Sequence, residues 1–203
     1  MKAENKKLDI DIYDFDKTIV PFDSGTLFFI YSMLHYPWCM VFLPFIGLAF
    51  LAMIIGLIHF TQFKKVCYIY VLFIPKKKAV AKFWDKYEKD VHPWFNERKR
   101  YSVVISASPD FLLEEIGKRL GFNELIATRH SIKTGIIVGK NCRGEEKVRR
   151  LFEIFDKNDI NIIDVYSDSL KYDKHIFALA TGKCFHIVDG EKNEFKYSEV
   201  YND

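Results

Sequence analysis

Residues 8–18 read LDIDIYDFDKT, and this stretch decides the fold. Apolar residues alternate with acids at its start, which predicts a β-strand with one face buried. Two carboxylates, Asp14 and Asp16, then follow with one residue between them, and a hydroxyl follows at Thr18. Residues that follow a strand of an α/β sheet project into the crevice where such sheets bind ligands. Two ionised carboxylates held this close repel each other, so the stretch predicts a site that takes a cation, a shared proton or both.

Three later stretches favour a catalytic interpretation over a simple capped turn, which Asp and Thr would also suit. Residues 102–108 read SVVISAS, an apolar run that ends in hydroxyl groups. Residues 144–147 read GEEK and place a lysine near the start of a predicted helix. Residues 162–168 read IIDVYSD, a second strand that ends in an acid, and Asp173 follows five positions later.

In this order the four stretches resemble the signature motifs of the haloacid dehalogenase-like hydrolases: Asp-x-Asp-x-Thr, a strand-terminal Ser or Thr, a Lys and an acidic pair. Residues 141–148, NCRGEEKV, are also similar to the subfamily that contains phosphoserine phosphatase and the membrane phosphatidylglycerophosphatases. Ser167 stands where many members carry glycine, and a small residue is kept there. The resemblance covers most of the chain outside residues 24–100.

Strands that alternate with helices in the second half predict an α/β fold with a mainly parallel, doubly wound, Rossmann-like sheet. The predicted strands are 101–106, 124–128, 162–166 and 184–188, the predicted helices are 110–120, 145–155 and 173–180, and a hairpin is predicted at 132–138. The resemblance implies the strand order 3-2-1-4-5, which would bring Asp14, Ser106 and Asp168 side by side. We expect residues 1–23 and 101–203 to form the catalytic core and residues 24–100 to form a helical, apolar cap inserted after the first strand.

The expected cap is unusually apolar, since no Asp, Glu, Lys or Arg occurs from Ser24 to Phe63. Residues 38–58 would form a helix about 31 Å long, which matches the hydrocarbon thickness of a bilayer. If Asp14 and Ser106 share one site, both lie on the same side of any membrane, so the segment between them crosses an even number of times or not at all. We therefore favour a hairpin of apolar helices, bent near Pro44, that dips into or lies along one leaflet. Lysines and aromatic residues between positions 64 and 100 suit a cytoplasmic membrane face.

Two alternatives remain open for these segments. The cap could bury its apolar face against itself or a second subunit, as in a homodimer. Residues 79–95 could equally form an amphipathic helix that packs on the core.

Composition narrows the class of partner. The 203 residues carry a formal net charge of +3, which is too small to argue for nucleic acid. The four cysteines have no metal-binding spacing and suit a reducing compartment. Residues 1–7 lack the apolar region of a secretory signal. We therefore expect a cytoplasmic protein, peripheral to or inserted at the cytoplasmic face of the cell membrane.

The resemblance implies a Mg²⁺-dependent phosphatase that works through an aspartyl-phosphate. Asp14 would be the nucleophile and Asp16 the general acid and base. The resemblance assigns phosphate binding to Thr18, Ser106 and Lys147. Thr18 is also suited to fixing the loop that carries Asp16. The implied metal-binding residues are Asp14, Asp16 through its main-chain carbonyl, Asp168, and Asp173 either through water or as an orienting residue.

The substrate is predicted from what the cap lacks. No arginine occurs between Asp14 and Arg98, so a substrate carboxylate such as that of phosphoserine would be poorly matched. The uncharged cap instead resembles that of the phosphatidylglycerophosphatase-type enzymes, which implies a lipid phosphate, phosphatidylglycerophosphate first. The alternatives are a soluble phosphatase for small phosphomonoesters, with the cap buried in a dimer, and a non-catalytic membrane-binding module.

Overall fold

The computed structural model describes residues 7–131 and 133–201 and is built on a six-stranded sheet in the order β3-β2-β1-β4-β5-β6. The strands are β1 (Leu8–Tyr13), β2 (Tyr101–Pro109), β3 (Glu124–Thr128), β4 (Ile160–Ser167), β5 (Cys184–Val188) and β6 (Glu191–Phe195). Strands β1 to β5 are parallel, and β6 runs antiparallel to β5 at the edge. The predicted α/β class and the order 3-2-1-4-5 are confirmed.

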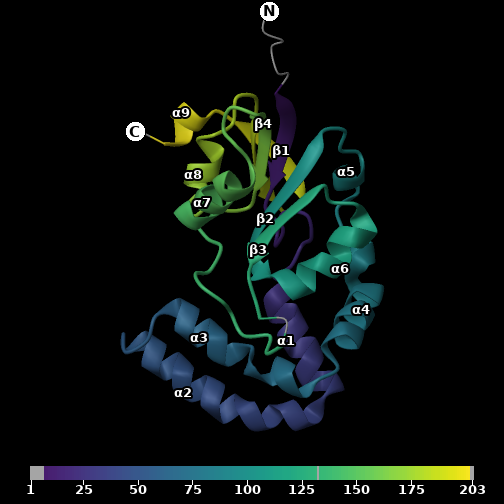
Figure 1. Cartoon of the computed structure of the whole chain (residues 1–203), viewed down its shortest axis with the longest axis vertical. Coiled ribbons are helices and arrows are strands. Elements are labelled where there is room, and N and C mark those ends of the chain that lie inside the picture. Colours follow the sequence, from purple (N-terminus) through teal and green to yellow (C-terminus); the bar gives the residue numbers. More distant parts are fainter. Residues whose placement is uncertain (1–6, 132, 202–203) are drawn as a thin grey trace, which may run out of the picture.

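Helices cover both faces of this sheet (Figure 1). Helix α6 (Asp110–Leu120) packs on one face, and α7 (Glu145–Ile154) and α8 (Lys174–Phe177) pack on the other. Successive side chains of a strand point to opposite faces, so Ile12 joins the core under α7 and Tyr13 joins the core under α6. A short helix, α9 (Tyr197–Val200), follows β6.

The first strand is buried on both sides, and the prediction that it has one solvent-facing side is wrong. Ile10, Asp11, Ile12 and Tyr13 are all buried. Parallel strands in a doubly wound sheet carry helices on both faces, so the acid at position 11 is buried as well. It is paired instead of solvated, because Nη1 of Arg100 lies 2.7 Å from Oδ1 of Asp11.

A helical segment is inserted between β1 and β2, and its first half lies at one end of the molecule while the rest runs back along the side of the sheet (Figure 1). It contains α1 (Ser24–His35), α2 (Leu43–Ile54), α3 (Phe60–Cys67), α4 (Lys76–Tyr87), α5 (Pro93–Asn96) and the 3-10 helices Pro37–Phe42, Ile69–Phe73 and Glu88–Asp90. The alternative of an amphipathic helix over 79–95 that packs on the core is met in part: α4 buries Ala79, Val80, Phe83 and Trp84, but it ends at Tyr87 and Pro93 begins a new helix.

Helices α2 and α3 lie side by side as a pair (Figure 1). The turn of this pair lies at residues 55–59 and not near Pro44, which corrects the predicted bend. Pro44 sits in the first turn of α2, where its missing N–H costs no hydrogen bond. Two other predicted elements are present in shorter form: the helix predicted over 173–180 is α8, and the hairpin predicted over 132–138 is a single bridge between His130 and Ile137, with Ile132 outside the described residues.

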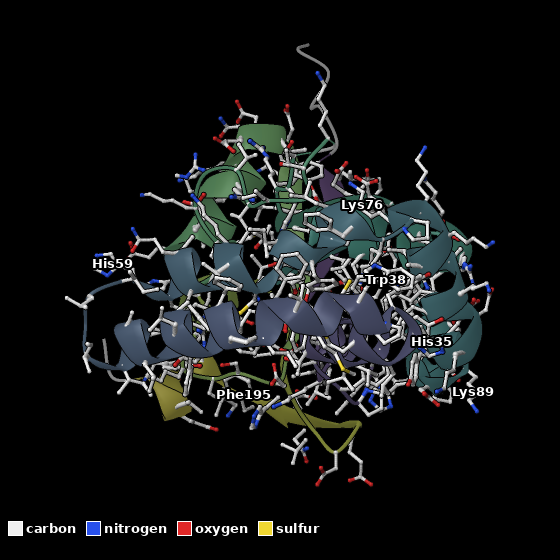
Figure 2. All side chains as sticks on the ribbon, turned by 90° about the horizontal axis from the view of Figure 1, so that it is seen from below. His35, Trp38, His59, Lys76, Lys89 and Phe195 are labelled. Carbon is white, nitrogen blue, oxygen red and sulfur yellow. The ribbon has the colours of Figure 1, made fainter. Side chains whose placement is uncertain are left out.

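The outer side of the inserted helical segment is apolar and exposed. Among the described residues, Pro37–Ile54 is the one helical segment long and apolar enough to cross a membrane, and 6% of it is buried. Figure 2 shows this segment running across the molecule from Trp38 towards His59. We define the apolar face by its exposed large side chains: Trp38, Met40, Val41, Leu43, Phe45, Leu48, Phe50, Leu51 and Ile54.

Candidate active site

A pocket of about 330 Å³ lies where β1, β2 and β4 end. These strands are neighbours in the sheet and all run the same way, so their carboxyl ends meet at one edge. The pocket brings together most of the predicted site residues, namely Asp14, Asp16, Ser106, Lys147, Asp168 and Asp173. Its lining also includes Lys17, Asp23, Lys64, Asn141 and Arg143. The pocket is therefore rich in charges of both signs.

Lys147 lies at the centre of the charge arrangement. It is 4% exposed, and its Nζ lies 2.7 Å from Oδ1 of Asp14 and 2.8 Å from Oδ2 of Asp173. The side chain comes from the first turn of α7, which begins after Gly144 at a φ of 61°. Burial disfavours the ammonium, but the two carboxylates more than offset this and raise the pKa of Lys147. The residue thus remains a cation inside the pocket.

Acidic side chains outnumber basic side chains in the lining of this pocket. Burial raises the pKa of Asp14, and the positive charge of Lys147 only partly opposes the shift. Burial also raises the pKa of Asp168, and the neighbouring carboxylate of Asp173 adds to it. Carboxyl groups with raised pKa values gain from further positive charge, so the pocket favours a bound cation.

The donor set fits Mg²⁺. Among residues 7–131 and 133–201, no group of three or more His, Cys, Asp or Glu side chains is placed to hold a metal ion. Mg²⁺ does not need such a group, because it usually takes one or two carboxylates and leaves its other positions to water and phosphate. Asp14 and Asp168 supply two carboxylates to one pocket, each directly after one of the neighbouring strands β1 and β4.

The carboxylate of Asp16 is held by the start of the cap. Oδ1 accepts a hydrogen bond of 2.8 Å from the main-chain N–H of Ser24, the first residue of α1. Oδ2 accepts one of 2.5 Å from Oγ of Ser108. Burial, with a smaller contribution from the charge of Asp23, raises the pKa of Asp16 to about 6 despite these bonds. Asp16 is thus fixed in orientation and can hold a proton more readily than an ordinary aspartate.

The two predicted hydroxyl residues occupy different places. Ser106 lines the pocket, and its Oγ accepts a hydrogen bond of 3.0 Å from the main-chain N–H of Ser108. Thr18 is fully buried behind the pocket, where its Oγ1 accepts a hydrogen bond of 2.9 Å from the main-chain N–H of Asp168. Thr18 therefore fixes the loop that carries Asp168.

Four further polar residues had no site role assigned from the sequence: Lys64 and Arg143 line the pocket, and Ser108 and Ser167 hold its carboxylates. Oγ of Ser167 donates a 2.5 Å hydrogen bond to Oδ2 of Asp173, and Ser108 binds Asp16. Nζ of Lys64 donates to the main-chain oxygen of Ala107 at 2.7 Å, and the guanidinium of Arg143 lies 3.4 Å from the ring centroid of Tyr172. The hydroxyls were detectable as polar residues at strand ends, whereas no local pattern marks a lysine in the cap.

Comparison with known proteins assigns the family. The sequence profile described as haloacid dehalogenase-like hydrolase matches residues 12–173. The chain belongs to this family. The predicted hydrolase is therefore confirmed.

Relatives of this hydrolase are distant. Protein CicA from Caulobacter vibrioides is 34% identical over 94 residues, a match that covers 44% of the chain and 41% of CicA. The hydrolase thus spans about two fifths of the length of the curated relative it matches.

Two solved structures are similar in fold. A protein of unknown function from Bordetella pertussis Tohama I aligns with a TM-score of 0.60 and 15% identity, over 76% of this chain and 77% of that one. A phosphoserine phosphohydrolase-like protein from Francisella tularensis subsp. tularensis SCHU S4 aligns with a TM-score of 0.54 and 15% identity, over 92% and 90%.

Proposed function

We propose that this hydrolase is a Mg²⁺-dependent phosphatase that cleaves phosphate monoesters through an aspartyl-phosphate on Asp14. The observation that carries the proposal is the position of Lys147, a buried cation in direct contact with the carboxylate of Asp14 and beside Asp168 and Ser106 in one pocket. A nucleophile that must approach a dianionic phosphate needs such compensation. Bound at Asp14 and Asp168, Mg²⁺ would supply further positive charge to the phosphate oxygens.

In the first step, a carboxylate oxygen of Asp14 attacks phosphorus as the bond to the ester oxygen breaks. Lys147 and Ser106 hold the non-bridging phosphoryl oxygens by hydrogen bonds. Asp16 donates its proton to the departing alkoxide, which leaves as an alcohol. In the second step Asp16, now ionised, accepts a proton from the water that attacks phosphorus, and Asp14 is released with inorganic phosphate. Ser108 and Ser24 hold Asp16 in place for both transfers.

For the substrate we propose a lipid phosphate, phosphatidylglycerophosphate first, approached at the cytoplasmic face of a membrane. The apolar face supports this, since a continuous surface of exposed large apolar residues marks an interaction site. In this proposal residues 24–100 act as a cap that rests on the lipid surface and presents the core to headgroup phosphates. The lysines at positions 76–78, in the first turn of α4, suit an anionic surface.

A second candidate is a water-soluble phosphatase for small phosphomonoesters. The overlap with the Francisella protein, described as phosphoserine phosphohydrolase-like, covers 92% of the chain and so extends through the inserted helices. In this alternative a second copy of the chain would cover the apolar face.

Flotation with vesicles that contain phosphatidylglycerol tests the choice, combined with hydrolysis of lipid and water-soluble phosphomonoesters in the presence of Mg²⁺. The lipid proposal expects the protein to float and to prefer lipid phosphates. The double variant Leu48→Asp, Leu51→Asp should lose flotation but keep hydrolysis of soluble esters, while Ile154→Asp, an exposed control on α7, should behave as the parent. A stable dimer that ignores vesicles and lipid phosphates would establish the second candidate.

A further inference from the structure

A second pocket, of about 340 Å³, opens between the cap helices and adjoins the catalytic pocket. Its volume lies at the lower end of the range for pockets that bind small organic ligands, about 300–1,000 Å³. The two pockets share Asp16, Asp23, Phe60, Lys64 and Ala107 in their linings. A ligand whose phosphate occupies the catalytic pocket would therefore extend its ester group into this second pocket.

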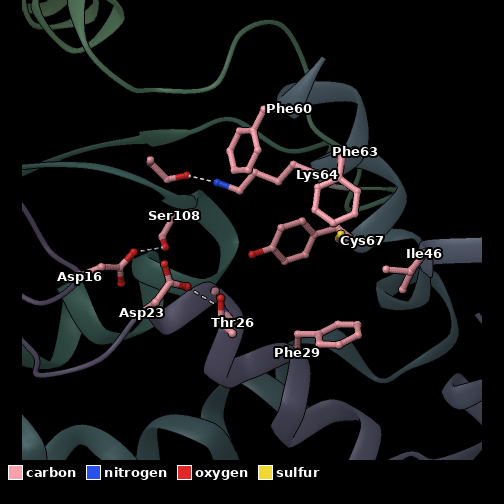
Figure 3. A pocket seen from close by; sticks show the side chains of 13 residues that line it. Asp16, Asp23, Thr26, Phe29, Ile46, Phe60, Phe63, Lys64, Cys67 and Ser108 are labelled. Atoms are coloured by element: carbon pink, nitrogen blue, oxygen red, sulfur yellow. Dashed lines mark hydrogen bonds between the residues drawn. The ribbon is translucent and has the colours of Figure 1, made fainter. Parts of the chain in front are cut away.

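The second pocket is polar at one end only. Figure 3 shows Asp16, Asp23 and Ser108 together on one side and the rings of Phe29, Phe60 and Phe63 around the opposite side. We define the apolar end by its lining residues Phe29, Ile46, Phe60, Phe63 and Cys67, which come from α1, α2 and α3. A hydrocarbon chain bound there would be removed from water.

Two charged side chains of this pocket, Lys64 and Asp23, are already engaged within the protein. Nζ of Lys64 donates to the main-chain oxygen of Ala107 and, at 3.2 Å, to Oδ1 of Asn141. Oδ1 of Asp23 accepts a 2.7 Å hydrogen bond from the main-chain N–H of Thr26, which caps α1. The carboxylate of Asp23 would repel a substrate carboxylate placed beside it. The pocket thus disfavours a charged, amino acid-like leaving group.

The apolar end is continuous with the apolar face. Ile46 belongs to α2, and the ring of Phe63 lies 5.7 Å from that of Phe50, which is part of the apolar face. A hydrocarbon chain that leaves a lipid surface at α2 would reach the pocket between α2 and α3. Helix α2 carries no charged side chain, and the charged side chains of α3 are Lys64 and Lys65 in its last turn.

We propose that this second pocket binds the first part of a hydrocarbon chain in the alcohol portion of the substrate, so that the enzyme selects alkyl phosphates over hydrophilic ones. This inference rests on the proposed phosphatase function and adds a place for the leaving group. It narrows the lipid class, because in phosphatidylglycerophosphate a glycerol and a phosphodiester separate the phosphate ester from the hydrocarbon. A substrate that fills the pocket carries its hydrocarbon chain next to the ester.

A series of straight-chain alkyl monophosphates from methyl to octyl, kept below micelle-forming concentrations and assayed with Mg²⁺, tests the proposal. Burial of each added methylene is expected to raise kcat/KM by up to about fourfold until the pocket is filled, after which the values level off. Phe63→Ala should move the plateau to longer chains, and Cys67→Leu should move it to shorter ones. Leu34→Ala, an exposed control on α1 outside the pocket, should keep the parental profile.

Equal kcat/KM for methyl and octyl phosphate, or an unchanged profile in both pocket variants, would overturn the proposal. Calorimetric titration with the non-hydrolysable methyl and octyl phosphonates measures the pocket independently of turnover. Tighter binding of the octyl compound by the parent, reduced in Cys67→Leu, supports the pocket even if no ester is cleaved. Hydrolysis of every ester with no dependence on chain length would leave the phosphatase standing and remove the hydrocarbon site.

Discussion

Nζ of Lys147 lies 2.7 Å from Oδ1 of Asp14, although 133 positions separate the two residues in the chain. The contact joins the end of the first strand to the first turn of α7. It places a permanent positive charge against the proposed nucleophile before any substrate binds. Because the ammonium is almost fully buried, its effect on a phosphate would be much larger than that of a solvated lysine.

Asp14→Asn tests the nucleophile. An amide cannot form the aspartyl-phosphate, so we expect hydrolysis of an aryl phosphate to fall at least about 10³-fold. Steady-state assays with Mg²⁺ measure the loss, and circular dichroism checks that the fold is kept. The matched control is Asp9→Asn on the same strand, where the side chain is exposed and the activity should be unchanged. Hydrolysis by Asp14→Asn at the parental rate would contradict the assignment.

Asp16→Asn separates proton transfer from nucleophilic attack. Without an acid to protonate the alkoxide or a base to activate water, we expect turnover of alkyl phosphates to slow by roughly 10²–10⁴-fold. The rate of the first step should fall less with an aryl phosphate, because its leaving group needs little protonation. Acid quenching with radiolabelled substrate should then trap a phosphoenzyme that lasts longer than in the parent. Unchanged turnover of an alkyl ester would exclude the acid and base role.

Local sequence patterns predicted the strands that carry the site, and the family resemblance supplied their order. The pattern failed at Asp11, because alternation within one strand cannot reveal that helices from distant segments cover both of its faces. It also failed at Lys64, which contacts Asn141 across 77 positions and lies in a segment whose composition favours a membrane surface. Both errors concern contacts between elements far apart in the chain, which periodicity does not encode.

Arg100→Met tests the ion pair that compensates the buried acids of the sheet. Nη1 of Arg100 lies 2.7 Å from carboxylate oxygens of both Asp11 and Asp164, which are almost fully buried, while the arginine itself is partly exposed. Loss of the pair would leave both carboxylates without their cation, and we expect the free energy of unfolding to fall by about 1–3 kcal/mol. Urea denaturation at pH 7 measures it.

The control for this variant is Arg129→Met. Arg129 forms an exposed pair with Glu153 at 3.5 Å, and such pairs contribute at most about 1 kcal/mol. Equal stability of the two variants would show that Asp11 and Asp164 are compensated by other groups.

Glu146→Gln should change the acid sensitivity of the protein. Hydrogen bonds from Arg149 and Arg150 lower the pKa of the Glu146 carboxyl to about 2, although burial opposes the shift. A carboxyl whose pKa is lower in the folded state stabilises the fold above its unfolded pKa near 4.5, and this contribution is lost as the pH falls towards 2. Because Arg149 is half exposed, we expect a contribution of about 1–2 kcal/mol at pH 7.

The stabilities of the parent and of Glu146→Gln should therefore differ at pH 7 and approach each other as the pH is lowered from 4.5 towards 2, as measured by urea denaturation at each pH. Glu194→Gln, which removes an exposed pair with Lys183, should change stability by no more than about 0.5 kcal/mol across the same range. A difference in stability between the parent and Glu146→Gln that stays constant from pH 7 to pH 3 would mean that Arg149 and Arg150 do not lower the pKa of the Glu146 carboxyl. In that case α7, and with it Lys147, would be anchored by the contacts of Arg150 with the main-chain oxygens of Ala127 and Lys140.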